Sequence, residues 1–491
     1  MLNMRRREFL QLSVLASGAS FFTPYGFGQP STSLRLTIDP HNTGSTIGPD
    51  FTGLSYEKAQ LGDPTFFSPQ NKELIALVRR LGESGVLRIG GNTSEYCYWT
   101  PKPTAADIAA SAAPVNPSTG KHPDAVRKIT PQAVRNLQGF VDTTGWNLIY
   151  GLNMGTGTPE AAADEAAYVM KLLGPKLVAF QLCNEPDLFF RNGIRKAGYD
   201  FTDFAKEWQH FYEVIRARVP NAPFSGPDTA FNTEWLVPFA KRFKNEIKFV
   251  SQHYYAEGPP TDPSMTIERL LRPNPKLEAE FAGMAQTRKD TGLPFRLTET
   301  NSCYQAGKQG VSNTFASALW GAELMYQLAT AGGIGINFHG GGFGWYTPIA
   351  GTQEKGFEAR PIYYGMLLFA QAGAGQLVEN KLSEPQPEDE VAAYSLKTPS
   401  GLKTILFNKN PNSALRVEID PGQRAQRAAM LQLTAPHLDS TSGVTLGGSA
   451  VEVTDAHADW SASDQPALRA KHGVFAVDLP AASAALISFA D

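Results

Sequence analysis

The sequence predicts an α/β fold in which a barrel of eight parallel strands, a (β/α)8 or TIM barrel, precedes an antiparallel β-sandwich. Across the middle of the chain, short apolar strands alternate eight times with amphipathic helical stretches, as such a barrel requires. From about residue 376 onward, short alternating runs are separated by Pro, Gly and Asn turns, which is typical of a β-sandwich. The length of 491 residues also exceeds one ordinary domain.

Residues 1–30 are expected to be a targeting segment outside the fold. Arg6-Arg7-x-Phe9-Leu10 opens an apolar run, residues 10–22, that is too short to span a bilayer. This pattern resembles a twin-arginine export signal, and an ordinary secretory signal with a chance arginine cluster is the alternative. Both interpretations predict export to the periplasm or the extracellular space.

The barrel is expected to occupy residues 49–375. Each predicted strand is a short apolar run that precedes a helical stretch or a loop. The eight strands are predicted at residues 53–57, 86–91, 147–153, 177–184, 223–227, 249–255, 295–299 and 335–339. The clearest helical stretches are residues 71–81, 161–173, 203–218 and 312–331. A doubly wound sheet is the alternative, but no Gly-rich phosphate loop follows the first strand.

The seventh predicted strand does not fit simple alternation. Alternation would point Arg296 and Thr298 at the surrounding helices and put Glu299 on the opposite face, with two large apolar residues. That arrangement is reasonable only if the strand contains a bulge. Residues 101–131, rich in Pro, Ala and Ser, are expected to form an excursion above the barrel mouth.

The β-sandwich is expected to occupy residues 376–491. A strand at residues 34–38, in the segment 31–48, alternates apolar and polar residues and is expected to join this domain. The other strands are predicted at residues 391–396, 403–407, 414–419, 430–434, 451–453 and 482–489.

Bulk composition excludes several classes of function. The formal net charge of −3 gives no general attraction to nucleic acid or to anionic membranes. Three cysteines, Cys97, Cys183 and Cys303, cannot form a closed disulfide framework, and no CxxC or His-rich metal spacing occurs. We therefore expect no metal and no cofactor, and a mature protein that is a monomer.

Two glutamates lie at the carboxyl ends of predicted strands four and seven. Barrel enzymes carry their catalytic residues at these strand ends. Glu185 follows an alternating strand in which Gln181, Cys183 and Glu185 itself should point inward, and Pro186 ends that strand. Glu299 ends the seventh strand, and these two strand tips face each other across a barrel mouth. A pair of carboxylates flanking a glycosidic bond can hydrolyse it. We assign Glu185 as acid/base and Glu299 as nucleophile, with Asn184 placed to bind the sugar 2-hydroxyl.

Neighbouring charged residues have other interpretations. Asp187 is expected to be a turn or helix-start residue. Arg88 either forms a structural ion pair or orients the nucleophile and keeps its pKa low, and we favour the second. His253 is expected to support the site by hydrogen bonds rather than to carry a proton in the reaction.

Four segments together resemble family-79 glycoside hydrolases, the β-glucuronidase and heparanase group. They are Asn184-Glu185-Pro186, His253-Tyr254-Tyr255, Glu299-Thr300-x-Ser302-x-Tyr304 and Leu87-Arg88-x-Gly90-Gly91. The resemblance covers the barrel and, more weakly, the terminal sandwich. Asn-Glu-Pro alone marks only the larger clan of barrel glycosidases, whereas the combination is more specific.

The resemblance implies a retaining β-glucuronidase that uses no metal, and it suggests which residues hold the sugar. Glu57 and Asn92 match positions that contact ring hydroxyls in relatives, and Tyr255 matches a tyrosine that supports the nucleophile. Tyr304 and Tyr346 match groups that bind the uronate carboxylate. Trp345, beside Tyr346, is a further candidate substrate contact, although each aromatic residue here could equally belong to the core or the rim.

One departure from the pattern concerns the residues after Tyr304. Heparanase-like members have two glycines there, whereas this chain has Gln305-Ala306, so the backbone approach to the carboxylate is expected to differ, with the loop 340–346 as the alternative. Three hypotheses for function follow. The first is an exo-acting β-glucuronidase, the second a neutral-sugar β-glycosidase or endo-glycanase of the same clan, and the third a non-catalytic carbohydrate-binding protein.

Overall fold

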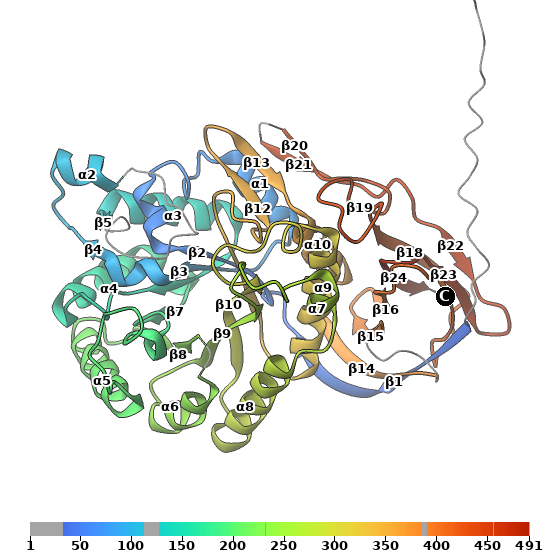
Figure 1. Cartoon of the computed structure of the whole chain (residues 1–491), viewed down its shortest axis with the longest axis horizontal. Coiled ribbons are helices and arrows are strands. Elements are labelled where there is room, and N and C mark those ends of the chain that lie inside the picture. Colours follow the sequence, from blue (N-terminus) through green and yellow to red (C-terminus); the bar gives the residue numbers. More distant parts are fainter. Residues whose placement is uncertain (1–32, 112–126, 231, 384–389, 455, 491) are drawn as a thin grey trace, which may run out of the picture.

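A computed structural model describes residues 33–111, 127–230, 232–383, 390–454 and 456–490. The chain forms an α/β barrel and, beside it, a domain built from one large β-sheet (Figure 1). The predicted targeting segment lies outside the described residues, so that interpretation stays a prediction. Within the described residues, no helix combines the length and apolarity needed to cross a membrane.

The barrel is closed by eight parallel strands, as predicted from the sequence. Around the barrel the strands follow the order β10-β11-β2-β3-β6-β7-β8-β9. Their bounds are Thr52–Glu57 (β2), Val86–Gly90 (β3), Asn147–Gly151 (β6), Leu177–Gln181 (β7), Phe224–Thr229 (β8), Phe249–Glu257 (β9), Phe295–Cys303 (β10) and Ile336–Gly340 (β11). The first and eighth strands pair directly, with Phe338 opposite Leu54, so the sheet has no free edge in the barrel.

Helices surround the barrel, and several of them begin at a residue whose side chain caps the first turn. Thr158 accepts a hydrogen bond from the Ala161 N–H at the start of α4, and Asp200 accepts two at the start of α5. The helices are Lys72–Arg80 (α1), Ala105–Ser111 (α2), Pro131–Thr144 (α3), Pro159–Leu173 (α4), Phe201–Arg218 (α5), Leu236–Arg242 (α6), Ile267–Leu271 (α7), Pro275–Thr291 (α8), Phe315–Thr330 (α9) and Pro361–Ala372 (α10). All four helices predicted by range are present.

The second domain is built around a single ten-stranded sheet. The main path runs β19-β18-β24-β16-β15-β14-β1-β17-β23, and β22 pairs with β18. The strands are Ser33–Ile47 (β1), Gly375–Leu382 (β14), Val391–Thr398 (β15), Gly401–Asn408 (β16), Leu415–Asp420 (β17), Arg427–Thr434 (β18), Thr445–Leu446 (β19), Ala467–Arg469 (β22), Phe475–Leu479 (β23) and Ser483–Ala490 (β24). Side chains from both ends of this path share one apolar core, so the continuous sheet encloses a sandwich-like interior.

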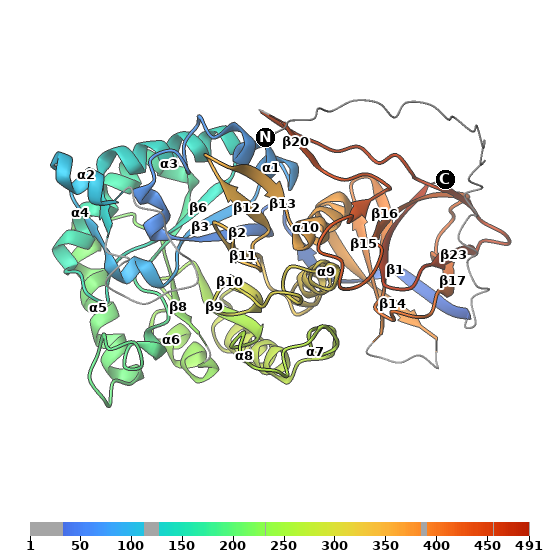
Figure 2. The ribbon, with the colours of Figure 1, turned by 45° about the horizontal axis from the view of Figure 1, so that its top comes forward.

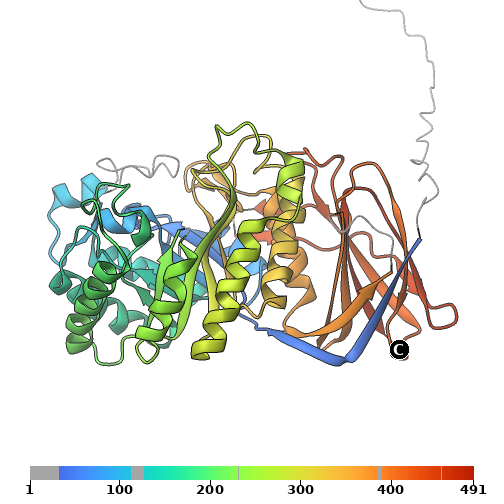
Figure 3. The same cartoon turned by 60° about the horizontal axis from the view of Figure 1, so that its bottom comes forward.

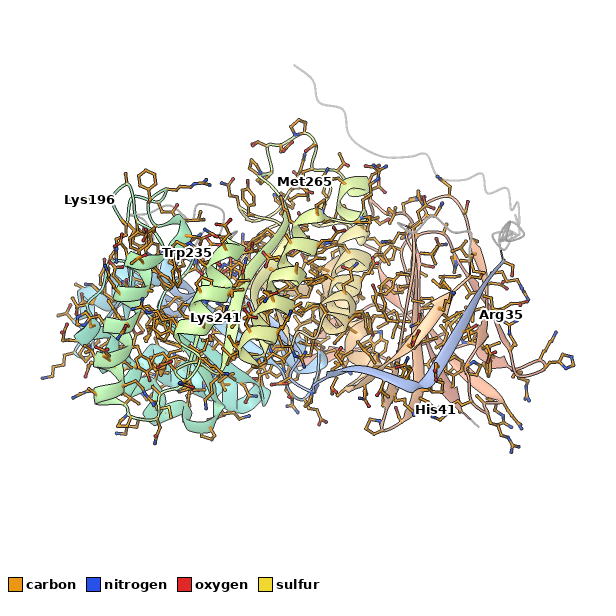
Figure 4. The ribbon with its side chains drawn as sticks, turned by 90° about the horizontal axis from the view of Figure 1, so that it is seen from below. Arg35, His41, Lys196, Trp235, Lys241 and Met265 are labelled. Carbon is orange, nitrogen blue, oxygen red and sulfur yellow. The ribbon has the colours of Figure 1, made fainter. Side chains whose placement is uncertain are left out.

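Strand β1 ties the start of the described chain to this sheet, as predicted. Leu34, Leu36 and Ile38 are buried and alternate with exposed residues. The strand pairs antiparallel with β14 but parallel with β17, so the sheet is mixed rather than purely antiparallel. Figure 3 shows β1 running along the sheet domain toward the barrel, and Figure 4 labels Arg35 and His41 on this strand.

Helices α9 and α10 lie between the barrel and the sheet domain (Figure 2). Helix α9 is buried on nearly every side, in keeping with its lack of a polar face. Tyr326 of α9 stacks on Tyr394 of β15 with ring centroids 5.2 Å apart. Lys409, just after β16, forms a buried ion pair with Glu323 of α9 at 2.9 Å. Apolar packing and this ion pair therefore hold the sheet domain against the barrel.

Three small two-stranded sheets complete the fold. They are Cys97–Trp99 (β4) with Arg127–Ile129 (β5), Ile349–Thr352 (β12) with Gly356–Ala359 (β13), and Glu452–Thr454 (β20) with His457–Asp459 (β21). The strand predicted at residues 451–453 belongs to the last of these hairpins rather than to the large sheet. Cys97, Cys183 and Cys303 are buried and unpaired.

Candidate active site

The carboxyl ends of the barrel strands converge on a buried cluster of charged side chains. Glu185 and Glu299 are 7% and 5% exposed, and Arg88 and His253 are fully buried between them. One oxygen of Glu185 and one of Glu299 lie within 4.8 Å of each other and of a ring nitrogen of His253. The structure thus brings together the two carboxylates that the sequence placed on strands four and seven.

The local backbone conformation sets the direction of the Glu185 side chain, but not in the way that strand alternation predicts. Strand β7 ends at Gln181, four residues before Glu185, and Cys183 packs in the main apolar core instead of pointing into the barrel. Glu185 adopts φ 50° and ψ 55°, the left-handed region that a non-glycine residue rarely occupies. This conformation just before Pro186, rather than a continued strand, directs its carboxyl at His253.

A bulge in β10 resolves the conflict in the seventh strand. The pairing with β9 shifts register between Leu297 and Glu299. As a result Thr298 and Glu299 both reach the barrel interior, where Thr298 Oγ1 donates to Asp228 and Glu299 accepts from Arg88. The bulge expected from the sequence is therefore present.

Arg88 connects Glu299 to Asn184, the amide that precedes Glu185. Its Nη1 donates to Glu299 Oε2, and its Nη2 donates to Asn184 Oδ1 at 2.8 Å. Asn184 Nδ2 then donates to Asn92 Oδ1 at 3.1 Å. Tyr255 Oη donates to the other oxygen of Glu299, Oε1, at 2.7 Å. Both oxygens of the nucleophile candidate are thus held by cationic or phenolic donors.

The two carboxyls differ in protonation because their surroundings differ. Burial raises the pKa of Glu185, and the hydrogen bond and charge of His253 only partly oppose this. Burial alone would also raise the pKa of Glu299, but the charges of His339, His253 and Arg88 outweigh it and lower that pKa to about 2. At neutral pH Glu299 is ionised, and Glu185 is the group of the two that holds its proton more tightly.

His253 contacts the Glu185 carboxyl. Its Nδ1 lies 3.0 Å from Glu185 Oε1, and its Nε2 lies 3.1 Å from Asp228 Oδ2. Burial would lower the pKa of His253, but the charge of Asp228 outweighs burial and raises it to about 10. The spacing of Glu185, His253 and Glu299 would also suit a cation, although the His253 nitrogens already face carboxylates and Arg88 supplies positive charge.

The other predicted sugar-binding residues lie around this cluster at different depths. Glu57 accepts from the Thr93 N–H at 2.8 Å and lies 3.6 Å from His339 Nε2. The Tyr346 and Tyr304 rings lie 6.2 and 6.4 Å from the Tyr255 ring. Their contacts with a sugar stay a prediction.

Trp345 is separate from the network. Its side chain is 37% exposed, and within the described residues its indole makes no hydrogen bond or ring contact. Its backbone N–H donates to the Ala306 carbonyl at 2.7 Å. The structure therefore places Trp345 at the surface, beside the cluster's neighbours rather than in it.

Sequence analysis missed three polar residues of this cluster, Glu95, Asp228 and His339. Gln181 was predicted to point inward and does so, since its Nε2 donates to Asp228 Oδ1 at 2.6 Å. Asp228 and His339 follow or end predicted strands five and eight, so the signal that revealed Glu185 was available for both. Glu95 accepts from the Asn184 backbone N–H at 2.6 Å, a contact between distant loops that no local pattern shows. Asp187 accepts from the Ala230 and Asn232 backbone N–H groups, which agrees with its predicted role in a turn.

Comparison with known proteins agrees with the sequence motifs. Residues 129–325 match the model of "Glycosyl hydrolase family 79, N-terminal domain". A β-glucuronidase of Aspergillus niger is 27% identical over 377 residues, covering 71% of this chain and 66% of that protein. A heparanase of Bos taurus is 26% identical over 391 residues, covering 68% of this chain and 67% of that protein. These matches support a family-79 glycoside hydrolase.

A solved structure supports the same architecture. The 4-O-α-L-rhamnosyl-β-D-glucuronidase of Fusarium oxysporum superposes with a TM-score of 0.75 at 16% identity, covering 93% of this chain and all of that one. At that identity the likeness concerns the fold alone. The chain spans about two thirds of the length of the curated relatives named above.

The chain has an unusual backbone after Tyr304, where heparanase-like proteins have two glycines. Gln305 and Ala306 both have positive φ, 60° and 67°, and Gly307 follows at 86°. Such angles favour glycine, so the departure in sequence does not produce an ordinary extended backbone. A side chain at position 307 would collide with the Tyr346 backbone N, 2.7 Å away, which places this turn directly against the loop that carries Tyr346.

Proposed function

We propose that the chain is an exo-acting, retaining β-glucuronidase. The observation that carries this proposal is the approach of a Glu185 oxygen to within 4.8 Å of a Glu299 oxygen. Retaining glycosidases hold their two carboxyls about 5–5.5 Å apart, whereas inverting enzymes leave about 6.5–9.5 Å for a water molecule. The close pair therefore favours direct attack by one carboxylate.

The two protonation states fit the two steps of such a reaction. The ionised Glu299 attacks the anomeric carbon while Glu185 gives its proton to the glycosidic oxygen, so that the bond to the leaving group breaks and a glycosyl ester forms. Glu185, now ionised, then removes a proton from water, and the resulting hydroxide displaces Glu299. Two inversions at the same carbon leave the sugar in its original β configuration.

Specificity for a uronic acid rests on the relatives and on the tyrosines near Glu299. Named relatives include β-glucuronidases of Aspergillus niger and Neurospora crassa. The Tyr304 and Tyr346 rings pack against the ring of Tyr255, whose hydroxyl donates to Glu299. We infer that their hydroxyls and the nearby turn at Gln305 donate hydrogen bonds to a carboxylate. We infer that neutral donors, not an arginine, bind the uronate.

Hydrolysis of a matched nitrophenyl panel tests this function. The β-glucuronide should be cleaved much faster than the β-glucoside, β-xyloside and β-galactoside, and NMR should show the β-anomer as first product. Glu185→Ala and Glu299→Ala should each abolish turnover of the glucuronide. Preference for a neutral sugar would retain the mechanism but refute the uronate site, and an inactive wild type that still binds glycans would favour a binding protein.

Tyr304→Phe tests the uronate site separately. Loss of one hydrogen bond to a charged group is worth about 1.5–3 kcal/mol, so glucuronide cleavage should fall roughly 10- to 100-fold. Cleavage of the β-glucoside, which lacks the carboxylate, should change little. An equal loss on both substrates would show that Tyr304 has no selective role.

Exo action is proposed because the segment that leads into the excursion at residues 101–131 is anchored beside the barrel. Trp99 Nε1 donates to Asp164 of α4 at 2.7 Å, and the Cys97 carbonyl accepts from Asn153 in the loop after β6. This anchors the base of the excursion beside the third barrel strand. Replacing residues 101–126 with a short Gly-Ser linker should add internal cleavage of a polymeric substrate. Unchanged products would contradict the assignment.

We also propose that the mature protein is exported and monomeric, and that it binds neither nucleic acid nor membranes. The motif Arg6-Arg7 supports export. Replacing both arginines with lysine should retain the protein in the cytoplasm, and N-terminal sequencing of the wild-type product should begin near residue 30. Analytical ultracentrifugation tests the monomer.

A further inference from the structure

Asp228 is a buried carboxylate that the proposed reaction does not use directly. It lies near the end of β8 (Phe224–Thr229) and is 1% exposed. Its φ of 63° puts it in the left-handed region, which aspartate and asparagine tolerate better than most residues. This backbone conformation directs the side chain into the barrel, between the two catalytic carboxyls.

Both oxygens of Asp228 are fully engaged. Oδ2 accepts from Arg88 Nη2 at 2.6 Å and lies 3.1 Å from His253 Nε2. Oδ1 accepts from Gln181 Nε2 at 2.6 Å and from Thr298 Oγ1. The Asp228 backbone carbonyl also accepts from the Glu185 N–H at 2.9 Å. Side chains from β3, β7, β9 and β10 and the backbone of the loop that carries Glu185 therefore all contact Asp228.

Each cation bound by Asp228 contacts one catalytic carboxyl. Arg88 continues to Glu299, and His253 continues through Nδ1 to Glu185 at 3.0 Å. When Asp228 accepts from the Nε2–H of a protonated His253, the Nδ1–H donates to Glu185 Oε1, which leaves Glu185 Oε2 to hold the acid's proton. The position of the acid's proton thus depends on an imidazole that Asp228 orients.

Charge balance gives Asp228 a second effect. Among the five groups that these contacts link, Arg88 and His253 are cations, Asp228 and Glu299 are anions, and a protonated Glu185 adds no charge, so these five balance. Removing the Asp228 charge would leave an excess cation, which the cluster can neutralise only by losing a proton from Glu185 or His253. The groups that face His253 and its partners are Arg88, Glu185, Asp228 and Glu299 in the barrel, His339 on β11, Glu280 on α8 and Asp187 after β7.

We propose that Asp228 is the positioning residue that keeps the proton on the acid Glu185 and the negative charge on the nucleophile Glu299, acting through His253 and Arg88. This inference rests on the proposed glycosidase function but not on the identity of the sugar. Asp228 does not touch the reacting atoms.

Asp228→Asn is the decisive variant, because asparagine keeps the shape and the left-handed backbone but removes the charge. Loss of an opposite charge moves pKa values by about 1–3. In the plot of kcat/KM against pH, the alkaline limb should therefore move to lower pH by at least about one unit. General acid catalysis contributes about 10²–10⁴-fold, so cleavage of a nitrophenyl glycoside should fall at least ~100-fold. The dinitrophenyl glycoside, whose leaving group needs no proton, should lose much less.

Glu165→Gln is the matched control. Glu165 is a buried carboxylate of α4 that pairs with Lys58 at 2.8 Å, outside the catalytic cluster. Its replacement should lower stability without moving the pH limbs. If Asp228→Asn also leaves the limbs in place and reduces both substrates equally, Asp228 is only structural and the proposal is overturned.

A measurement on the wild type keeps the proposal testable even if Asp228→Asn does not fold. In 15N-histidine NMR, with the signal assigned by its loss in His253→Gln, both His253 nitrogens should carry protons at pH 7. A neutral His253 at that pH would refute the proposal. Kinetics use whichever nitrophenyl β-glycoside the wild type cleaves best, so a wrong sugar assignment would not be mistaken for failure of the role of Asp228.

Discussion

Replacing each catalytic glutamate by glutamine should affect stability in opposite ways, although both variants lose activity. Glu299 is held ionised in the folded protein. Burial would raise its pKa, but the charges of His339, His253 and Arg88 lower the pKa from 4.5 to about 2. Glu185 faces fewer cations, and burial raises its pKa above 4.5. Glutamine resembles the protonated form, so it replaces Glu185 well and Glu299 badly.

The size of the effect follows from linkage between protonation and folding. A drop in the pKa of Glu299 from 4.5 to about 2 corresponds to about 3 kcal/mol of folding free energy. Because the folded-state pKa lies below the unfolded value, this contribution is complete above pH 4.5 and is lost as pH falls through 2. With about 2 cal/mol/K of unfolding entropy per residue, Glu299→Gln should lower Tm by about 5 °C at pH 7 for a barrel of roughly 330 residues.

Glu185→Gln should show the opposite dependence on pH. Because the folded-state pKa of Glu185 lies above the unfolded value, the carboxyl favours the folded state fully below pH 4.5 and loses that preference as pH rises through the folded value. Glutamine cannot ionise, so the Tm of this variant should equal that of the wild type at pH 4 and match or exceed it at pH 7.

Thermal unfolding followed by circular dichroism between pH 3 and pH 8 tests both variants together. The deficit of Glu299→Gln should shrink to less than half by pH 3. Equal Tm shifts for the two variants at pH 7, or a Glu299→Gln deficit that does not depend on pH, would refute the assignment of charge between the two carboxyls.

Two further substitutions test neighbouring contacts. Tyr255→Phe removes the 2.7 Å hydrogen bond to Glu299 and should lower kcat roughly 10- to 100-fold. The control is Tyr254→Phe, which should leave kcat unchanged because the Tyr254 hydroxyl has no hydrogen-bond partner in the described structure. Equal losses of kcat in the two variants would contradict this. Lys409→Met leaves the buried Glu323 carboxylate of α9 without its cation and should destabilise the protein by about 3–5 kcal/mol, measured as a lower Tm. An unchanged Tm would show that this ion pair does not hold the two domains together.

The barrel was predictable because its strands carry a local signal. Most of the eight strands open on apolar residues, and each is followed by a helix or loop, so periodicity located all of them within a few residues. The same signal located Glu185 and Glu299, since a carboxylate at a strand end stands out against apolar residues. The single continuous sheet, with β1 parallel to β17, was not predictable, because strand order depends on contacts far apart in the sequence.

Periodicity could not predict the direction in which individual side chains point. Glu185 and Asp228 both point into the barrel because their backbones turn left-handed, and neither residue type demands that conformation. Glu299 points inward because β10 bulges after Leu297. A sequence pattern could require that bulge but could not place it. The catalytic cluster therefore departs from regular strand geometry at three positions, which is common at functional sites.

These departures explain how one barrel gives two identical side chains different tasks. Arg88 and the Tyr255 hydroxyl both contact Glu299, so the negative charge is stabilised on that side of the cluster. Glu185 contacts only His253 among these donors, and the imidazole is itself held by Asp228. A regular strand end would give Glu185 no such partner. The asymmetry between acid and nucleophile thus comes from where the backbone leaves the strand, because that decides which carboxyl reaches the guanidinium and which reaches the imidazole.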